Sequence, residues 1–210
     1  AIGEFLEELH AIARASGNPV VMLETPRLEW IVEQEAFWDV FYEHCNYFTE
    51  DALKHLCVRA GFQVVRQEPS FGGQYQVLEL RASSPKQEAG DKEGRLIDLD
   101  RFGSRVEAQK AKLVEKLKEC GAERGWSIWG AGAKGVALAN QLPFQAPKSV
   151  IDVNPAKQGC FISGTNVPIV PPDDRRALDS QVLLISNPNY AVEIKEELER
   201  LGFRNSVVAL

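Results

Sequence analysis

Three glycines with the spacing G-x-G-x-x-G are the residues of this chain most clearly arranged for chemistry. Gly130, Gly132 and Gly135 follow a short apolar run, 126–129, and precede a helix-like segment that reaches Leu142. Glycines at these positions permit a tight turn, a close approach of backbone to a ligand, and close packing of the helix on the strand. The N–H groups that begin such a helix can bind an anion. The spacing therefore predicts a Rossmann-like strand, loop and helix.

An acidic residue stands where the next strand of this unit would end. Asp152 directly follows the apolar pair Val150-Ile151. In dinucleotide-binding folds, an acid at this place accepts a hydrogen bond from a ribose hydroxyl. The same three glycines can also serve only as a tight turn between strand and helix. The pattern predicts the fold, and it leaves open whether a dinucleotide binds.

Composition excludes several classes of protein. The 210 residues carry a net charge of −6, with 44% hydrophobic and 26% charged residues, as in ordinary globular proteins. This charge, without a basic patch interleaved with aromatic residues, argues against nucleic-acid binding. Apolar runs are too short to span a membrane, and no signal peptide precedes them. The four cysteines form no C-x-x-C pair, so we expect no metal site and no disulfide framework, and a cytoplasmic protein with free thiols.

Hydrophobic periodicity predicts an α/β protein with two folded parts. Helices are expected at 5–13, 28–32, 50–60, 99–119, 133–142 and 190–201, and strands at 20–23, 63–67, 74–80, 126–129, 150–151, 169–170, 182–185 and 206–209. Residues 69–73 are the expected loop of a hairpin, and Thr49 and Asn189 are expected helix caps. The polar segment 83–95 contains no apolar residue larger than alanine, which predicts a linker between 1–82 and 96–210. The alternation of strands and helices after the linker favours a mostly parallel sheet.

Several motifs resemble one known family. Gly130-Ala-Gly-Ala-Lys-Gly135, Asp152-Val-Asn-Pro-Ala-Lys-Gln-Gly159 and Gly164-Thr-Asn-Val-Pro-Ile169 resemble the C-terminal domain of SAM-dependent sugar C-methyltransferases, which modify nucleotide-linked deoxysugars. Residues 1–82 are similar to the preceding region of that family, the last part of a class I methyltransferase fold. There the family has Tyr-x-Glu-His before an aromatic pair; here the residues are Phe41-Tyr42-Glu43-His44, then Tyr47-Phe48.

The resemblance implies a site for methyl transfer to a carbon next to a sugar carbonyl. Such a reaction needs a base that removes a carbon-bound proton and leaves an enolate, and histidine suits this task near neutral pH. His44 stands in the matching motif and is the candidate base. Glu43 would orient the imidazole or bind a sugar hydroxyl, and Tyr42 or Tyr47 would donate a hydrogen bond to the enolate oxygen. From the residues alone, the favoured interpretation is that the aromatic side chains only pack and that Glu43 and His44 form a solvated loop pair; the family resemblance reverses this preference.

The resemblance also implies that the C-terminal domain holds the nucleotide-sugar substrate. Phosphates would bind at the helix that follows Gly132, close to Lys134, and Lys157 in the Asn-Pro-x-Lys-Gln-Gly loop would make a second contact. The predicted substrate-binding residues are thus Tyr47, Gly130, Gly132, Lys134, Gly135, Asp152 and Lys157. A solvated loop lysine is an equally good interpretation of Lys157.

The sequence departs from the family in one large respect. Residues 1–82 contain no glycine-rich loop for S-adenosylmethionine, so we expect a fragment of a longer methyltransferase, inactive alone, whose cofactor binds mainly to residues not in this chain. Two alternatives remain. One is a nucleotide-sugar-binding module without chemistry. The other is an NAD-dependent oxidoreductase, although Asn154-Pro155 after Asp152 is unusual for one and no hydride-transfer site is evident.

Overall fold

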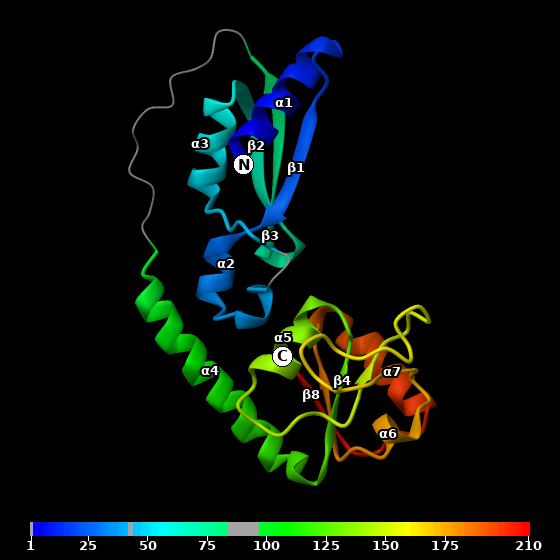
Figure 1. Cartoon of the computed structure of the whole chain (residues 1–210). Coiled ribbons are helices and arrows are strands. Elements are labelled where there is room, and N and C mark those ends of the chain that lie inside the picture. Colours follow the sequence, from blue (N-terminus) through cyan, green and yellow to red (C-terminus); the bar gives the residue numbers. More distant parts are fainter. Residues whose placement is uncertain (1, 42–43, 84–96) are drawn as a thin grey trace. The chain divides into compact units, whose positions relative to one another are not determined.

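The structure is a computed structural model, and it describes residues 2–41, 44–83 and 97–210 (Figure 1). The chain divides into two compact units. The first comprises Ala1–Ala36 and Glu43–Phe102, and the second comprises Phe37–Tyr42 and Gly103–Leu210. The predicted linker lies outside the described residues except for Ser83. Both units mix helices and strands, as predicted.

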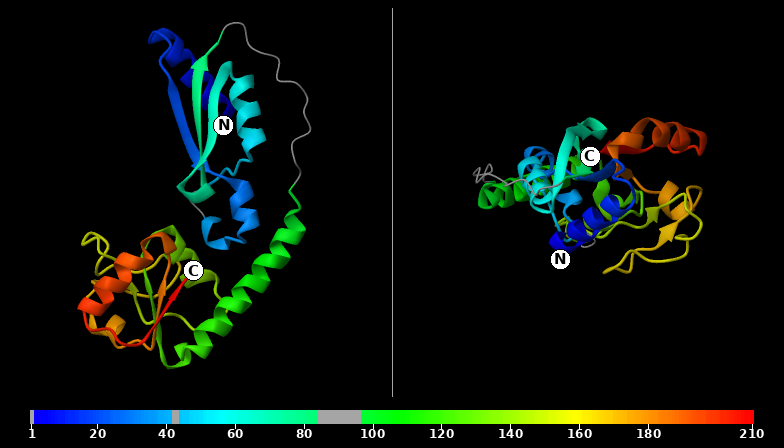
Figure 2. Two further views of the ribbon diagram at one scale, coloured as in Figure 1. Left: turned by 180° about the vertical axis from the view of Figure 1, so that it is seen from behind. Right: turned by 90° about the horizontal axis from the view of Figure 1, so that it is seen from above.

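The first unit is built on a three-stranded antiparallel sheet with the strand order β1-β3-β2. Its elements are α1 (Ile2–Ala15), β1 (Val21–Pro26), α2 (Leu28–Glu33), α3 (Glu50–Arg59), β2 (Phe62–Ser70), the short 3-10 turn η2 (Phe71–Gly73) and β3 (Tyr75–Ala82). Every second residue of β3 is buried, among them Leu78 and Leu80, as expected for a sheet with one covered face. These leucines share a core cluster with Leu6 of α1 and Leu53 of α3, so both helices pack on that face (Figure 2).

Two local predictions in this unit meet different outcomes. Thr49 caps α3, because its hydroxyl accepts a hydrogen bond from the Ala52 N–H at 3.1 Å. The hairpin between β2 and β3 is confirmed, but β2 continues through Pro69 and Ser70, which were predicted as loop. A proline is compatible with this strand because β2 lies at an edge of the sheet, where every second N–H points away from the neighbouring strand.

The second unit contains a five-stranded, all-parallel sheet with the order β6-β5-β4-β7-β8. Its elements are α4 (Leu99–Glu119), which starts in the first unit, β4 (Trp126–Trp129), α5 (Ala133–Gln141), β5 (Val150–Ile151), β6 (Ile169–Val170), α6 (Arg175–Leu178), β7 (Val182–Ile185), α7 (Ala191–Arg200) and β8 (Ser206–Ala209). Three 3-10 turns also belong to it, η1 (Phe37–Asp39), η3 (Ala122–Arg124) and η4 (Pro188–Tyr190). In order of the chain, the sheet reads third, second, first, fourth, fifth, which is the arrangement of a Rossmann-like half-domain. The predicted Rossmann-like fold is thus confirmed.

The parallel sheet is buried on both faces. Every residue of β4, β5, β6 and β7 is buried, the pattern expected where helices cover both sides. Ile194 and Leu198 of α7 pack in one cluster with Leu183 and Ile185 of β7. The predicted cap at Asn189 is wrong: Asn187 accepts the Asn189 N–H at 3.2 Å and caps η4, after which α7 begins.

The direction of the strands fixes where a site can form. The loops after β4, β5 and β7 all leave the sheet at its carboxyl edge. In open α/β sheets, ligands bind at this edge, near the point where the strand order reverses. Here the reversal falls between β4 and β7. Of the described helices, none is long and apolar enough to cross a membrane.

Candidate functional site

The glycine loop has the backbone geometry that its spacing predicted. Gly130 has φ = 108°, a conformation that other residues rarely adopt. A Cβ at Gly135 would lie 1.9 Å from the Gly130 carbonyl oxygen, so the third glycine is required for α5 to pack on the loop. A Cβ at Gly132, the extended residue before α5, would meet open space. Two of the glycines are therefore needed by the fold itself, and the second borders unfilled volume.

A buried serine supports the first glycine from the neighbouring strand. Ser186 follows β7, and its hydroxyl donates to the Trp129 carbonyl at 2.8 Å. A Cβ at Gly130 would lie 2.4 Å from that hydroxyl oxygen. Sequence reasoning missed Ser186, because only the pairing of β4 with β7 brings it beside the loop.

The Asp152 carboxylate is engaged by three groups of its own unit. It accepts the Ala131 N–H at 3.0 Å, the Asn154 N–H at 2.9 Å and the Lys157 ammonium at 2.9 Å. Burial alone would raise the pKa of Asp152, but the hydrogen bonds from Asn154, Lys157 and Ala131 and the charge of Lys157 outweigh it and lower that pKa. Lys157 also donates to the Ala131 carbonyl at 3.2 Å. The aspartate and lysine thus join the loop after β5 to the glycine loop.

Lys134 pairs with an aspartate from far away in the sequence. Its ammonium lies 3.3 Å from Oδ1 of Asp39, and the two side chains are 17% and 7% exposed. Asp39 ends η1 (Phe37–Asp39), which packs against α5 as part of the second unit. The ring of Phe37 lies under the Lys110 ammonium at 5.3 Å. A phosphate at Lys134 would have to compete with the Asp39 carboxylate.

The candidate base lies in the first unit, on the segment before α3, where residues 44–47 have no regular secondary structure. The rings of His44 and Tyr47 meet edge to face, with centroids 6.1 Å apart. The Phe48 carbonyl accepts hydrogen bonds from the Leu28 N–H and the Gln76 side-chain amide, both at 3.1 Å. These bonds fix the end of the segment to the sheet. Tyr42 and Glu43, the other predicted catalytic residues, lie outside the described residues.

The predicted residues therefore form two groups. Gly130, Gly132, Lys134, Gly135, Asp152 and Lys157 come together at the carboxyl edge of the parallel sheet, and His44 and Tyr47 come together in the first unit. In the described part of the chain, no cluster of three or more His, Cys, Asp or Glu side chains could hold a metal ion. The four cysteines are free thiols.

Comparison with known proteins places this fold in a family. Residues 74–207 match the family described as the C-methyltransferase C-terminal domain. The chain belongs to this family. It is also 28% identical to the C-methyltransferase NovU of Streptomyces niveus, over 96% of the chain and 52% of that protein. The chain thus spans about half the length of the curated relative that it matches.

In this C-methyltransferase domain, the glycine loop does not fit a nucleoside cofactor well. Among the described connections from a strand to a helix, only the one after β4 is rich in glycine. The acid that would accept a ribose hydroxyl, Asp152, already accepts hydrogen bonds from Ala131, Asn154 and Lys157. An S-adenosylmethionine or NAD ribose would have to displace the Lys157 ammonium or share the carboxylate.

Proposed function

We propose that this chain forms the C-terminal portion of an S-adenosylmethionine-dependent C-methyltransferase acting on a nucleotide-linked deoxysugar. The observation that carries the proposal is the likeness to a C-methyltransferase, which extends over 96% of the chain and so includes the segment of His44 as well as the glycine loop. In such an enzyme, S-adenosylmethionine supplies the methyl group. The residues of this chain would prepare the acceptor carbon and hold the substrate.

The preparation of the acceptor would rest on His44. In the neutral form, its imidazole can take a proton from a carbon beside a carbonyl, because the negative charge that forms is shared with the carbonyl oxygen. Tyr47, whose ring touches that of His44, carries a hydroxyl that can donate to this oxygen. Glu43 and Tyr42 remain proposed as an orienting carboxylate and a second donor. The hydrogen bonds to the Phe48 carbonyl would limit the freedom of the residues from His44 to Phe48.

The parallel-sheet domain would serve the substrate rather than the proton transfer. Two carboxylates of the same domain hold its glycine loop in place: Asp152 accepts a hydrogen bond from the Ala131 N–H, and Asp39 pairs with Lys134. A rigid carboxyl edge is the usual scaffold for a ligand in such folds. We propose that this domain binds the nucleotide part of the substrate and that the tightness of this binding helps to position the sugar.

Exchange of the acidic proton tests the base without methyl transfer. The full-length gene product is incubated in D₂O with a nucleotide-linked keto-deoxysugar, and deuterium at the carbon beside the carbonyl is followed by NMR. His44→Asn should slow the exchange by about 10²–10⁴-fold, the usual contribution of a general base. His55→Asn, on α3, is the matched control and should exchange as the parent does.

The possible outcomes test the role of His44 and the proposed reaction separately. Exchange that His44→Asn leaves unchanged would refute His44 as the base. Failure of the parent protein both to exchange the proton and to methylate the sugar with S-adenosylmethionine would refute the proposed reaction. If the protein still bound the nucleotide in that case, the result would favour the alternative function, a nucleotide-sugar-binding module that catalyses no reaction.

A further inference from the structure

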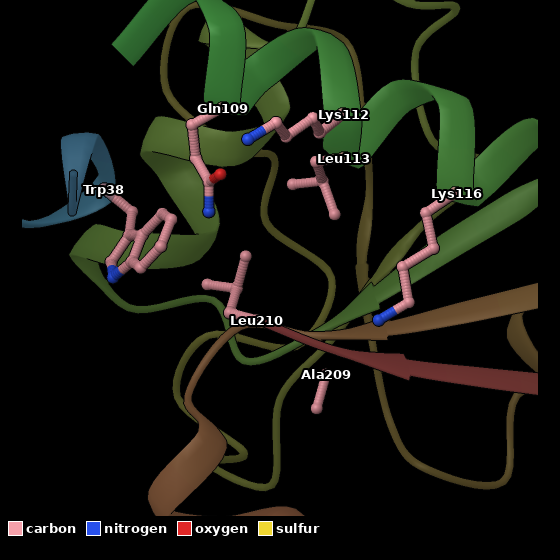
Figure 3. Close-up of a pocket in the computed structure, with 7 residues that line it drawn as sticks. All are labelled: Trp38, Gln109, Lys112, Leu113, Lys116, Ala209 and Leu210. Carbon is pink, nitrogen blue, oxygen red and sulfur yellow. The ribbon is translucent and has the colours of Figure 1, made fainter. Parts of the chain in front are cut away.

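A small cavity opens beside the last strand of the second unit. It measures about 150 Å³ and is lined by residues of α4, the end of β8 and η1, namely Trp38, Gln109, Lys112, Leu113, Lys116, Ala209 and Leu210 (Figure 3). Because it lies where β8 ends, it belongs to the carboxyl edge of the parallel sheet. Pockets that enclose a whole drug-sized ligand measure roughly 300–1,000 Å³. This cavity can therefore hold one group of a larger molecule.

The cavity is basic, although the chain as a whole is acidic. Lys112 and Lys116 stand one turn apart on α4, and none of the described lining side chains is acidic. Like charges at this spacing repel each other. Over the described residues, neither lysine side chain takes part in an ion pair or a hydrogen bond. An anion between them would relieve the repulsion.

The other lysines near this edge of the sheet are already paired. Lys134 lies against Asp39 and Lys157 against Asp152. Lys110, on another side of α4, pairs with Glu107 at 2.9 Å. Lys112 and Lys116 therefore have their full charge available for a ligand, whereas the charges of Lys134 and Lys157 are already partly neutralised by a carboxylate.

The remaining walls suit a phosphate that carries an organic group. Gln109 offers an amide one turn before Lys112, and Figure 3 shows its side chain directed toward Leu210 across the cavity. Trp38, which is 7% exposed, forms an aromatic wall. Trp38 is next to Asp39 in the sequence. The ion pair between Asp39 and Lys134 holds this part of the cavity wall against α5, the helix that follows the glycine loop.

We infer that this cavity is the phosphate subsite of the domain, where Lys112 and Lys116 bind the diphosphate of a nucleotide-linked substrate. The inference deepens the proposed function and rests on it. It assigns the phosphate contacts to α4 instead of to Lys134 and Lys157.

Calorimetric titration of the full chain tests the assignment, with uridine diphosphate, inorganic pyrophosphate and uridine as probes. Lys112→Met and Lys116→Met should each weaken the binding of both phosphate compounds about tenfold, as expected for the loss of one charge-assisted hydrogen bond. Lys118→Met is the matched control, because Lys118 is on the same helix but lies over the Phe144 ring at 5.8 Å. It should change the affinity less than twofold. Thermal unfolding checks that each variant is folded.

Two results would overturn the inference. If uridine diphosphate binds and only Lys134→Met or Lys157→Met weakens it, the phosphates lie at the glycine loop, and the proposed function survives. If neither uridine diphosphate nor pyrophosphate binds at millimolar concentration, the cavity is no phosphate subsite; the deuterium exchange described above then decides on the function separately. Equal binding of uridine and uridine diphosphate would also refute a role for the two lysines.

Discussion

The buried ion pair between Lys134 and Asp39 gives the most direct test of how the second unit is assembled. The pair joins α5 to η1 across a 3.3 Å contact, and water reaches little of either side chain. Lys134→Met keeps much of the side chain's apolar length and removes its charge. Asp39 then remains as a buried carboxylate that has lost its ammonium partner.

The burial of the two groups sets the size of the effect. Breaking one partner of a fully buried pair costs about 3–5 kcal/mol, because the other charge stays desolvated. Since the Lys134 side chain is 17% exposed, water offsets part of this loss, and we expect about 2–3 kcal/mol. Asp39→Asn in the same protein removes the remaining carboxylate charge. The double variant should therefore be more stable than the sum of the single changes by about 1–2 kcal/mol.

Urea unfolding followed by tryptophan fluorescence measures these differences. Three of the four tryptophans, Trp38, Trp126 and Trp129, belong to the second unit. At a slope of about 1–3 kcal/mol per molar urea, Lys134→Met should lower the midpoint by about 1 M. Lys112→Met, which removes an exposed lysine of the same unit, is the control and should stay within about 0.5 kcal/mol. A loss in Lys134→Met no larger than in this control, or strict additivity in the double variant, would refute the coupling.

Two further predictions concern the glycine loop. Gly135→Ala should lower the free energy of unfolding by about 3 kcal/mol, because its Cβ would overlap the Gly130 carbonyl. Gly132→Ala should lower it by less than about 1 kcal/mol, because its Cβ meets open space. Equal melting temperatures of the two variants would contradict this prediction. Asp152 has a lowered pKa, so its ionised form stabilises the folded state above the unfolded pKa of about 3.9, and this stabilisation is lost as the pH falls through the folded pKa. Urea titrations should therefore show the parent more stable than Asp152→Asn at pH 7, with the difference shrinking toward pH 2–3; a difference that is independent of pH would contradict it.

Local patterns predicted most of the fold because most of its elements are specified locally. The strand β4, the loop at Gly130 and the helix α5 follow from spacing alone, and the predicted role of Gly135 in packing is confirmed by its contact with the Gly130 carbonyl. The four-residue helix α6 was missed because it is too short to show a period, although Asp174 gives a cap signal: its side chain accepts the Arg176 N–H at 2.8 Å.

The candidate site was less predictable because its contacts join distant parts of the chain. Asp39 and Lys134 lie far apart in the sequence, and hydrophobic periodicity does not predict that their segments meet. The polar and aromatic residues around Phe37 do not indicate that η1 packs against α5. The same holds for Ser186 beside Gly130. A sequence motif gives the types of side chain that are present, and only the fold decides which charges neutralise one another.

This distinction changes what the glycine fingerprint means here. In a dinucleotide-binding domain, the loop amide, the helix end and the acid after the second strand are left available to the ligand. In this domain the Ala131 amide is bonded to Asp152, Asp152 to Lys157, and Lys134 to Asp39. The Ala131 amide, the Asp152 carboxylate and the Lys134 ammonium are each engaged within the unit, so a nucleotide at this loop would depend mainly on the N–H groups that begin α5. The basic cavity beside β8 offers an anion two lysine side chains at the same edge of the sheet, and neither forms an ion pair with a described residue.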